Sequence, residues 1–166
     1  TFNAPLVANH EIATWFGEKG VGDARGMNKG GSMQAGPVKV TMTNAVHSSS
    51  MMDGEKIVYG GEAAGFVVGF PDGRSLYFAG DTAVFCDMAL IYELYQPQLC
   101  ILPIGDLYTM GPKEAALACR LLKPAKVIGM HWGTFPPLVG TPQALAALVG
   151  NQTEVIALEP GGSYDW

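Results

Sequence analysis

Three residues whose side chains can bind a divalent metal ion each follow a short apolar segment of the chain. The segments and the residues after them are Val38–Thr43 with His47, Ser75–Ala79 with Asp81, and Lys126–Met130 with His131. Imidazole and carboxylate suit Zn²⁺ and similar ions. A catalytic metal ion keeps one coordination position open for water and lowers the pKa of that water to about 7, which makes it a nucleophile at neutral pH. The alternative is that these are structural loop and turn residues.

The apolar segments are typical of β-strands. Val38–Thr43 alternates and is rich in β-branched residues. Further strands are expected at Ala64–Phe70, Ser75–Ala79, Leu99–Ile104, Lys126–Met130 and Val155–Leu158. Pro71–Arg74 predicts a hairpin turn between the first two of these. Because α/β proteins place their sites beyond the carboxyl ends of strands, this edge is where we expect the chemistry.

Helices are predicted between these strands by their capping residues. Asn9 is typical of an N-cap for a helix over His10–Lys19, and Asp87 for one over Met88–Tyr95. Two more helices open at Pro112 and at Thr141-Pro142. Beyond the first helix, the glycine-rich stretch up to Gly36 is predicted to be mostly loop. The alternation indicates an α/β protein and one domain over residues 1–166.

Composition narrows the function further. Charged residues are 15% of the 166 residues against a typical value of about 25%, so we expect surface to be covered by other chain segments or a subunit. Net charge is −5 and the basic residues are scattered, which argues against nucleic-acid binding through phosphate contacts. The sequence shows neither a membrane-spanning run nor a signal peptide. Three cysteines without CxxC spacing favour a reduced, cytoplasmic protein.

Five local sequences occur in a characteristic order: Ala45–Ser50, Phe78–Thr82, Leu102–Asp106, Thr109–Ala116 and Met130–Pro136. Together they resemble a group of metal-dependent hydrolases that are relatives of ascorbate-6-phosphate lactonase in the metallo-β-lactamase superfamily. The resemblance extends from about Leu6 to Gly162. It implies a metallo-β-lactamase-like αββα sandwich, of which this chain is the C-terminal portion.

The resemblance also implies a role for each candidate residue. His47 matches a ligand of a first metal ion, Asp81 the aspartate that bridges two ions, and His131 a ligand of the second ion. A metal-bridging hydroxide would attack an ester, lactone, amide or phosphoester of a small molecule. Zinc is the expected metal, with Mn, Fe or Ni as alternatives. Asp106 is given an orienting catalytic role; the alternative is a loop carboxylate that accepts backbone N–H groups.

One departure from the family pattern is large. The His-x-His-x-Asp-His segment is absent, since the only histidines are His10, His47 and His131, and the strands that precede that segment are missing as well. Two ligands would remain for each ion, where catalytic zinc normally has about three. We therefore expect weak metal binding by this chain alone, and a missing N-terminal segment or another subunit as partner, with a homo-oligomer expected. Whether the chain is a fragment or a natural short form stays open.

Two other functions are alternatives to hydrolysis. A non-catalytic assembly or binding module could be built on the same truncated fold. A Rossmann-like nucleotide binder would need a GxGxxG turn between strand and helix, whereas the glycine cluster at Lys29–Ser32 precedes a strand. For a hydrolase, the lactonase relative suggests a small, anionic substrate, and Trp132 and Phe135 beside His131 are candidates for lining its pocket.

Overall fold

A computed structural model describes residues 4–159 and 161–166 of the chain. Their strands are β1 (Leu6–Asn9), β2 (Ala24–Met27), β3 (Ser32–Ala35), β4 (Val38–Asn44), β5 (Ser50–Asp53), β6 (Lys56–Tyr59), β7 (Ala64–Gly69), β8 (Ser75–Phe78), β9 (Leu99–Pro103), β10 (Lys126–Met130) and β11 (Glu154–Ile156). The helices are α1 (His10–Glu18), α2 (Met88–Tyr95), α3 (Pro112–Leu122) and α4 (Pro142–Val149), with a short 3₁₀ turn at Gly150–Gln152.

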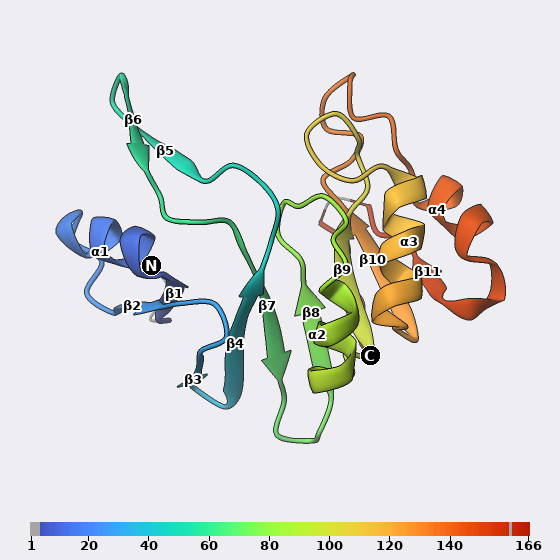
Figure 1. Cartoon of the computed structure of the whole chain (residues 1–166), viewed down its shortest axis with the longest axis horizontal. Coiled ribbons are helices and arrows are strands. Elements are labelled where there is room, and N and C mark those ends of the chain that lie inside the picture. The colour runs from blue at the N-terminus through green and yellow to red at the C-terminus, as the bar shows by residue number, and fades with distance from the viewer. Residues whose placement is uncertain (1–3, 160) are drawn as a thin grey trace.

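A mixed sheet of seven strands forms the centre, in the order β11-β10-β9-β8-β7-β4-β3 (Figure 1). Strands β8 to β11 are parallel to one another, while β7 is antiparallel to both β8 and β4. It follows that β4 runs in the same direction as β8 to β11. The carboxyl ends of all five strands therefore meet at one edge of the sheet, and β4, β8 and β10 are the strands that precede His47, Asp81 and His131.

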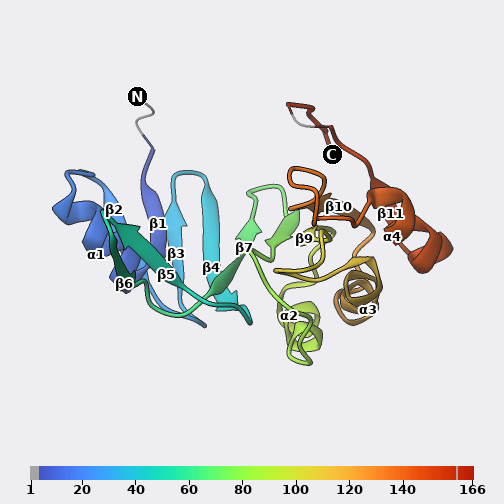
Figure 2. The same cartoon turned by 90° about the horizontal axis from the view of Figure 1, so that it is seen from above.

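Helices α2 and α3 lie on one face of this sheet, and α4 lies beside α3 and β11 (Figure 2). One register row across the sheet points into this layer, from Val67 through Tyr77 and Cys100 to Val127. These side chains pack against fully buried helix residues such as Leu122 and Leu145. Each buried leucine contributes about 1.5–3 kcal/mol to stability, so these contacts stabilise the packing of the helices on the sheet. The mixed sheet with its covering helices is an α/β sandwich, as predicted.

The opposite face of the sheet carries a second apolar row. It crosses five strands in register through Phe66, Phe78, Ile101, Ile128 and Ile156. These side chains are half-buried, apart from Phe78, which is 40% exposed. Among the described residues, none of this row belongs to the buried core that α2 and α3 form with the other row.

Two predicted N-caps explain where their helices begin, whereas Asp87 precedes α2 without a capping hydrogen bond from its side chain. Asn9 Oδ1 accepts a hydrogen bond from the backbone N–H of Ile12 at 2.9 Å, and Thr141 Oγ1 accepts one from Ala144 at 3.1 Å. Each bond satisfies one of the free N–H groups of a first helical turn. At the other ends, α2 and α3 stop at Gln96 and Lys123, which both adopt the left-handed conformation.

The structure corrects two predictions about local structure and adds one hairpin. Strands β2 and β3 lie within the stretch that was predicted to be mostly loop, because β2 pairs with β1 and β3 pairs with β4. The β5–β6 hairpin was not predicted at all. The last strand is β11 at Glu154–Ile156, one residue earlier and shorter than the predicted Val155–Leu158. Across the residues described, the helices are all too short or too polar to cross a bilayer.

Candidate metal centre

Asp81 and His131 face one another at the carboxyl edge of the sheet. Their nearest atoms, Asp81 Oδ2 and His131 Nε2, are 3.7 Å apart, and both side chains are partly exposed. This separation is too long for a hydrogen bond. Two ligands bound at about 2.1 Å to one tetrahedral ion are about 3.4 Å apart, and wider angles give slightly more. The pair therefore has the spacing of two ligands of a common ion.

The backbone around His131 holds this side chain at the edge. His131 has a positive φ of 55°, and the preceding Met130 carbonyl accepts a hydrogen bond from Ile104 N at 3.0 Å. Gly105 passes so close that a Cβ there would lie 1.9 Å from the His131 carbonyl oxygen. The ends of β9 and β10 thus meet only because residue 105 has no side chain. His131 Nδ1 is buried and has no hydrogen-bond partner among the described residues, so this ring nitrogen is left with an unmet bonding capacity.

His47 lies at the same edge in a different environment. It lines, together with Asp81, a cavity of about 440 Å³ that also includes Asn9 and Glu62. Its Nδ1 is 2.9 Å from the Ser48 carbonyl and its Nε2 is 3.1 Å from the Tyr108 carbonyl. A neutral imidazole has one N–H and can donate to only one of these oxygens. The Ser48 contact is of the kind that orients a metal-binding histidine, while the Tyr108 contact occupies the nitrogen that would bind the ion.

Thr82 connects the segments that carry Asp81 and His47. Its side chain is fully buried; Oγ1 accepts from Val46 N at 3.0 Å and donates to the Ala83 carbonyl at 2.7 Å. The Thr82 carbonyl also accepts from Met110 N at 3.1 Å. Thr82 was not among the predicted site residues, although its position directly after Asp81 and before a loop was the available signal. Its hydroxyl joins the segment that carries His47 to the segment that carries Asp81.

Asp106 is a loop carboxylate that accepts a backbone N–H group, as in the structural alternative given for it. Asp106 Oδ1 accepts a hydrogen bond from the Leu107 N–H at 2.7 Å. Asp106 and Leu107 both have positive φ, of 70° and 62°, so the carboxylate supports an unusual turn. That turn positions Tyr108, whose carbonyl contacts His47. Asp106 is therefore linked to His47 through its loop, and a catalytic role for it stays a prediction.

The three predicted ligands do not converge on one point. Among the residues that the structure describes, no three His, Cys, Asp or Glu side chains are close enough to hold an ion together. The structure brings Asp81 to His131, and it brings Asp81 and His47 into one cavity. Their donor atoms are of the type that zinc, manganese or iron accept, but two donors are fewer than the three of a typical catalytic zinc site.

A second cavity of about 410 Å³ opens beside His131. Trp132, Thr134, Leu158 and Glu159 line it with His131. Trp132 was predicted as a lining residue, whereas Phe135 is not part of the lining and is exposed. Leu158 and Glu159 were missed, although they follow β11 at the same edge and the strand-end rule applies to them as well.

The positive charge near these cavities is already neutralised by an ion pair. Lys29 lines another cavity beside His47, of about 610 Å³, but its amine is 2.9 Å from a Glu62 carboxylate oxygen and 2.7 Å from Asn44 Oδ1. The cavity beside His131 has Glu159 as its charged wall. The described lining of these two cavities thus provides no unpaired lysine or arginine for an anionic substrate.

Comparison with known proteins identifies the superfamily of the chain. The family described as Beta-lactamase superfamily domain matches residues 2–132. A relative named UPF0173 metal-dependent hydrolase from Solibacter usitatus is 60% identical over 99% of this chain and 72% of its own length. Another of that name, from Rubrobacter xylanophilus, is 50% identical over 95% of this chain and 67% of its own length.

A solved structure has the same fold at recognisable sequence identity. It is a metallo hydrolase from the archaeon Ignicoccus hospitalis, 34% identical, with a TM-score of 0.81 over 94% of this chain and 66% of the other. The chain therefore belongs to the metallo-β-lactamase superfamily. Within that superfamily it belongs to the UPF0173 metal-dependent hydrolases. This membership does not favour the alternative of a non-catalytic module.

Proposed function

We propose that Asp81, His131 and His47 contribute to a two-metal site that hydrolyses a small molecule, with zinc as the metal and manganese, iron or nickel as alternatives. The observation that supports it most is the 3.7 Å separation of Asp81 Oδ2 and His131 Nε2, in a chain from a family of metal-dependent hydrolases. When bound, such ions would lower the pKa of water and polarise the substrate oxygen.

The chain's own residues have separate tasks in this proposal. Asp81, which faces His131 and lines a cavity with His47, would hold both ions, and each histidine would supply an imidazole nitrogen to one of them. His47 has to exchange its Tyr108 carbonyl contact for the ion, while Ser48 keeps its ring orientation. Asp106 holds the turn that presents Tyr108 and is a positioning residue.

The substrate is proposed to be an uncharged ester, lactone or amide with an apolar group beside the reacting carbonyl. Trp132 and Leu158 provide apolar surface next to His131, and Glu159 in the same wall disfavours an anion there. A phosphoester fits less well because Lys29 is already paired with Glu62. The phosphorylated substrate that the lactonase relative suggested is therefore not our first choice.

Further ligands for the two ions are proposed to come from another segment of the protein or from a second subunit. The apolar row through Phe78 and Ile101 offers a surface for such a partner, because half-exposed phenylalanine and isoleucine in a continuous row gain stability when covered. Sedimentation of the purified chain at several concentrations tests the second-subunit form. A monomer at every concentration would leave the additional segment as the only source.

Zinc binding to point variants tests the ligand assignment. We expect Asp81→Asn and His131→Gln to weaken zinc binding by about 100-fold or more in competition with a chromophoric chelator, since each removes one of few donors. His10→Gln is the matched control, because His10 is an exposed histidine on α1. Zinc affinity unchanged by Asp81→Asn would contradict the proposal, and hydrolysis of an aryl ester surviving both variants would do so independently.

A further inference from the structure

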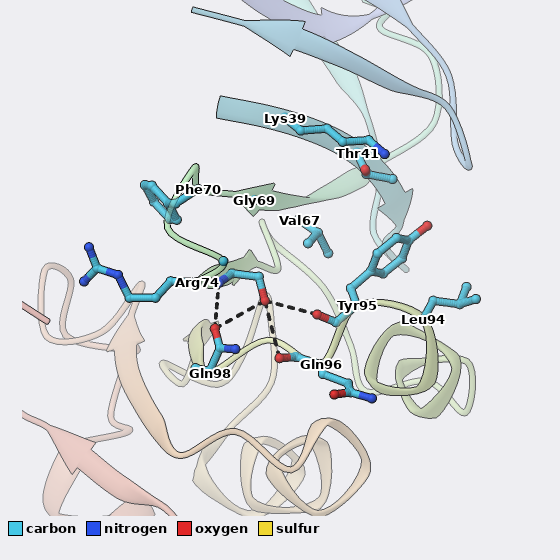
Figure 3. A pocket seen from close by; sticks show the side chains of 12 residues that line it. Lys39, Thr41, Val67, Gly69, Phe70, Arg74, Leu94, Tyr95, Gln96 and Gln98 are labelled. Carbon is cyan, nitrogen blue, oxygen red and sulfur yellow. Dashed lines mark hydrogen bonds between the residues drawn. The ribbon is translucent and has the colours of Figure 1, made fainter. Parts of the chain in front are cut away.

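A separate cavity lies at the other end of the sheet. It measures about 410 Å³ and is formed by the start of β4, the end of β7, the 70–74 hairpin and the last turn of α2 (Figure 3). These are the opposite strand ends from those that carry Asp81 and His131. Cavities that bind small molecules measure about 300–1,000 Å³, so this one has the size of a ligand site.

The walls of this cavity combine a single unmatched cation with apolar surface. Lys39 and Arg74 are its basic residues, and no Asp or Glu stands among the described residues that line it. Arg74 points away from Val67 in Figure 3, and its guanidinium is 2.7 Å from Asp72 Oδ2. Lys39 takes part in none of the ion pairs of residues 4–159 and 161–166. In a protein of net charge −5, this cavity is therefore locally positive.

The remaining polar groups are fixed by hydrogen bonds. Gln98 Oε1 accepts from Ser75 N at 2.6 Å, which leaves the Gln98 amide N–H₂ as a donor. Ser75 Oγ donates to the carbonyl of Tyr95 at 3.1 Å and ties the end of α2 to β8 (Figure 3). Because these bonds hold the wall in place, a ligand would meet a preformed surface, which lowers the entropy cost of binding.

Glycine 69 opens the space beside Lys39. Gly69 and Lys39 are register partners on β7 and β4, and Thr41 and Val67 form the next pair on the same face. A Cβ at Gly69 would meet only the Lys39 carbonyl oxygen, at an ordinary 3.8 Å. A side chain at this position would therefore extend into the cavity without a clash.

We infer that this cavity binds a small organic monocarboxylate with an apolar body. Lys39 would pair with the carboxylate, the Gln98 amide could donate to it, and Val67, Phe70, Leu94 and the Tyr95 ring would contact the apolar part. One unmatched positive charge suits one negative charge, whereas a phosphate dianion would require a second cation, and Arg74 is already committed to Asp72.

The test uses 3-phenylpropanoate, its neutral amide and inorganic phosphate as probes, titrated into the chain with chelator present so that no metal ion competes for the acid. Amide chemical shifts report both the affinity and the location. We expect saturable shifts at Gly69, Ser75 and Gln98, with a dissociation constant of about a millimolar for a ligand of this size. The dissociation constants of the neutral amide of 3-phenylpropanoate and of inorganic phosphate are expected to be higher by a factor of about 10 or more.

Two variants test separately whether binding requires the charge of Lys39 and the open space beside Gly69. Lys39→Gln should weaken 3-phenylpropanoate binding by about 10-fold or more, while Lys56→Gln, at an exposed lysine on β6, leaves it unchanged. Gly69→Leu should abolish binding by filling the cavity, with Gly17→Leu on α1 as its control, because open space surrounds Gly17. The spectra also show whether each variant is folded. If Gly69→Leu does not fold, the binding measurement on Lys39→Gln alone tests the inference.

Three results would overturn the inference. They are the absence of saturable binding to the wild-type chain, equal binding of the acid by the wild type and Lys39→Gln, and shifts confined to the Asp81–His131 edge. Equal affinity for phosphate or for the neutral amide would contradict the assigned ligand class. Because metal is excluded, each outcome is independent of whether the proposed hydrolase site is correct.

Discussion

Replacing Thr82 by valine tests whether its hydroxyl holds the candidate site together. Valine has nearly the same shape as threonine, so Thr82→Val removes two hydrogen bonds without leaving a cavity. Each bond contributes about 1 kcal/mol net, and an N–H left without a partner costs up to about 3 kcal/mol when it is buried. Val46 N is part-buried, so we expect a loss of about 1–3 kcal/mol in the free energy of unfolding.

Thermal unfolding followed by circular dichroism measures this loss. In a chain of this length, 1 kcal/mol corresponds to about 2–4 °C, which gives an expected decrease of about 2–12 °C in Tm. Thr14→Val is the matched control, since the exposed Thr14 hydroxyl bonds only to His10 O within α1, and we expect a change within about 0.5 kcal/mol.

Zinc affinity gives the second measurement on the same variant. If the Thr82 hydroxyl sets the spacing of the Asp81 and His47 loops, Thr82→Val weakens zinc binding, and Thr82→Ser, which retains the hydroxyl, restores it. A Thr82→Val protein that melts and binds zinc like the wild type would refute this role. A protein that melts lower but binds zinc normally would restrict Thr82 to stability.

Three further outcomes are expected. Gly105→Ala places a Cβ 1.9 Å from the His131 carbonyl and should lower the free energy of unfolding by about 3 kcal/mol or more, measured with urea; an unchanged midpoint would contradict the close approach. Gly17→Ala near the end of α1, where open space surrounds the residue, should stabilise by about 0.5–1 kcal/mol in the same assay. At pH 8 a chromogenic disulfide should label the exposed Cys86 rapidly and the buried Cys100 and Cys119 only after denaturation. The reason is that burial raises the pKa of the Cys119 thiol to about 12 and raises the pKa of the Cys100 thiol strongly. Rapid labelling of all three cysteines would contradict their burial.

The central elements could be predicted from sequence because local signals and tertiary packing agree in them. The β4, β7 and β8 segments alternate or are continuously apolar, and Asn9 and Thr141 cap helices as their types suggest. Strands β2 and β3 lacked such signals. Each has four residues within a glycine-rich stretch, and each exists because a neighbouring strand, β1 or β4, supplies its hydrogen bonds.

The candidate site also has features that could be predicted from the sequence and features that could not. That Asp81 and His131 lie at one edge follows from the strand order, which the rule of carboxyl strand ends anticipates. The rotation of His47 onto two carbonyls was beyond prediction, because it depends on the left-handed turn at Asp106 and Leu107, where no glycine marks the conformation. The role of Thr82 depends on a long-range bond to Val46 that no local pattern encodes.

The most direct measurement of the central claim is a crystal structure of the zinc-loaded protein with anomalous scattering recorded at the zinc edge. The proposed site predicts an anomalous peak between Asp81 Oδ2 and His131 Nε2, with both atoms at about 2.0–2.2 Å from the ion. Zinc bound elsewhere, or zinc at this edge without the Asp81 carboxylate among its ligands, would contradict it.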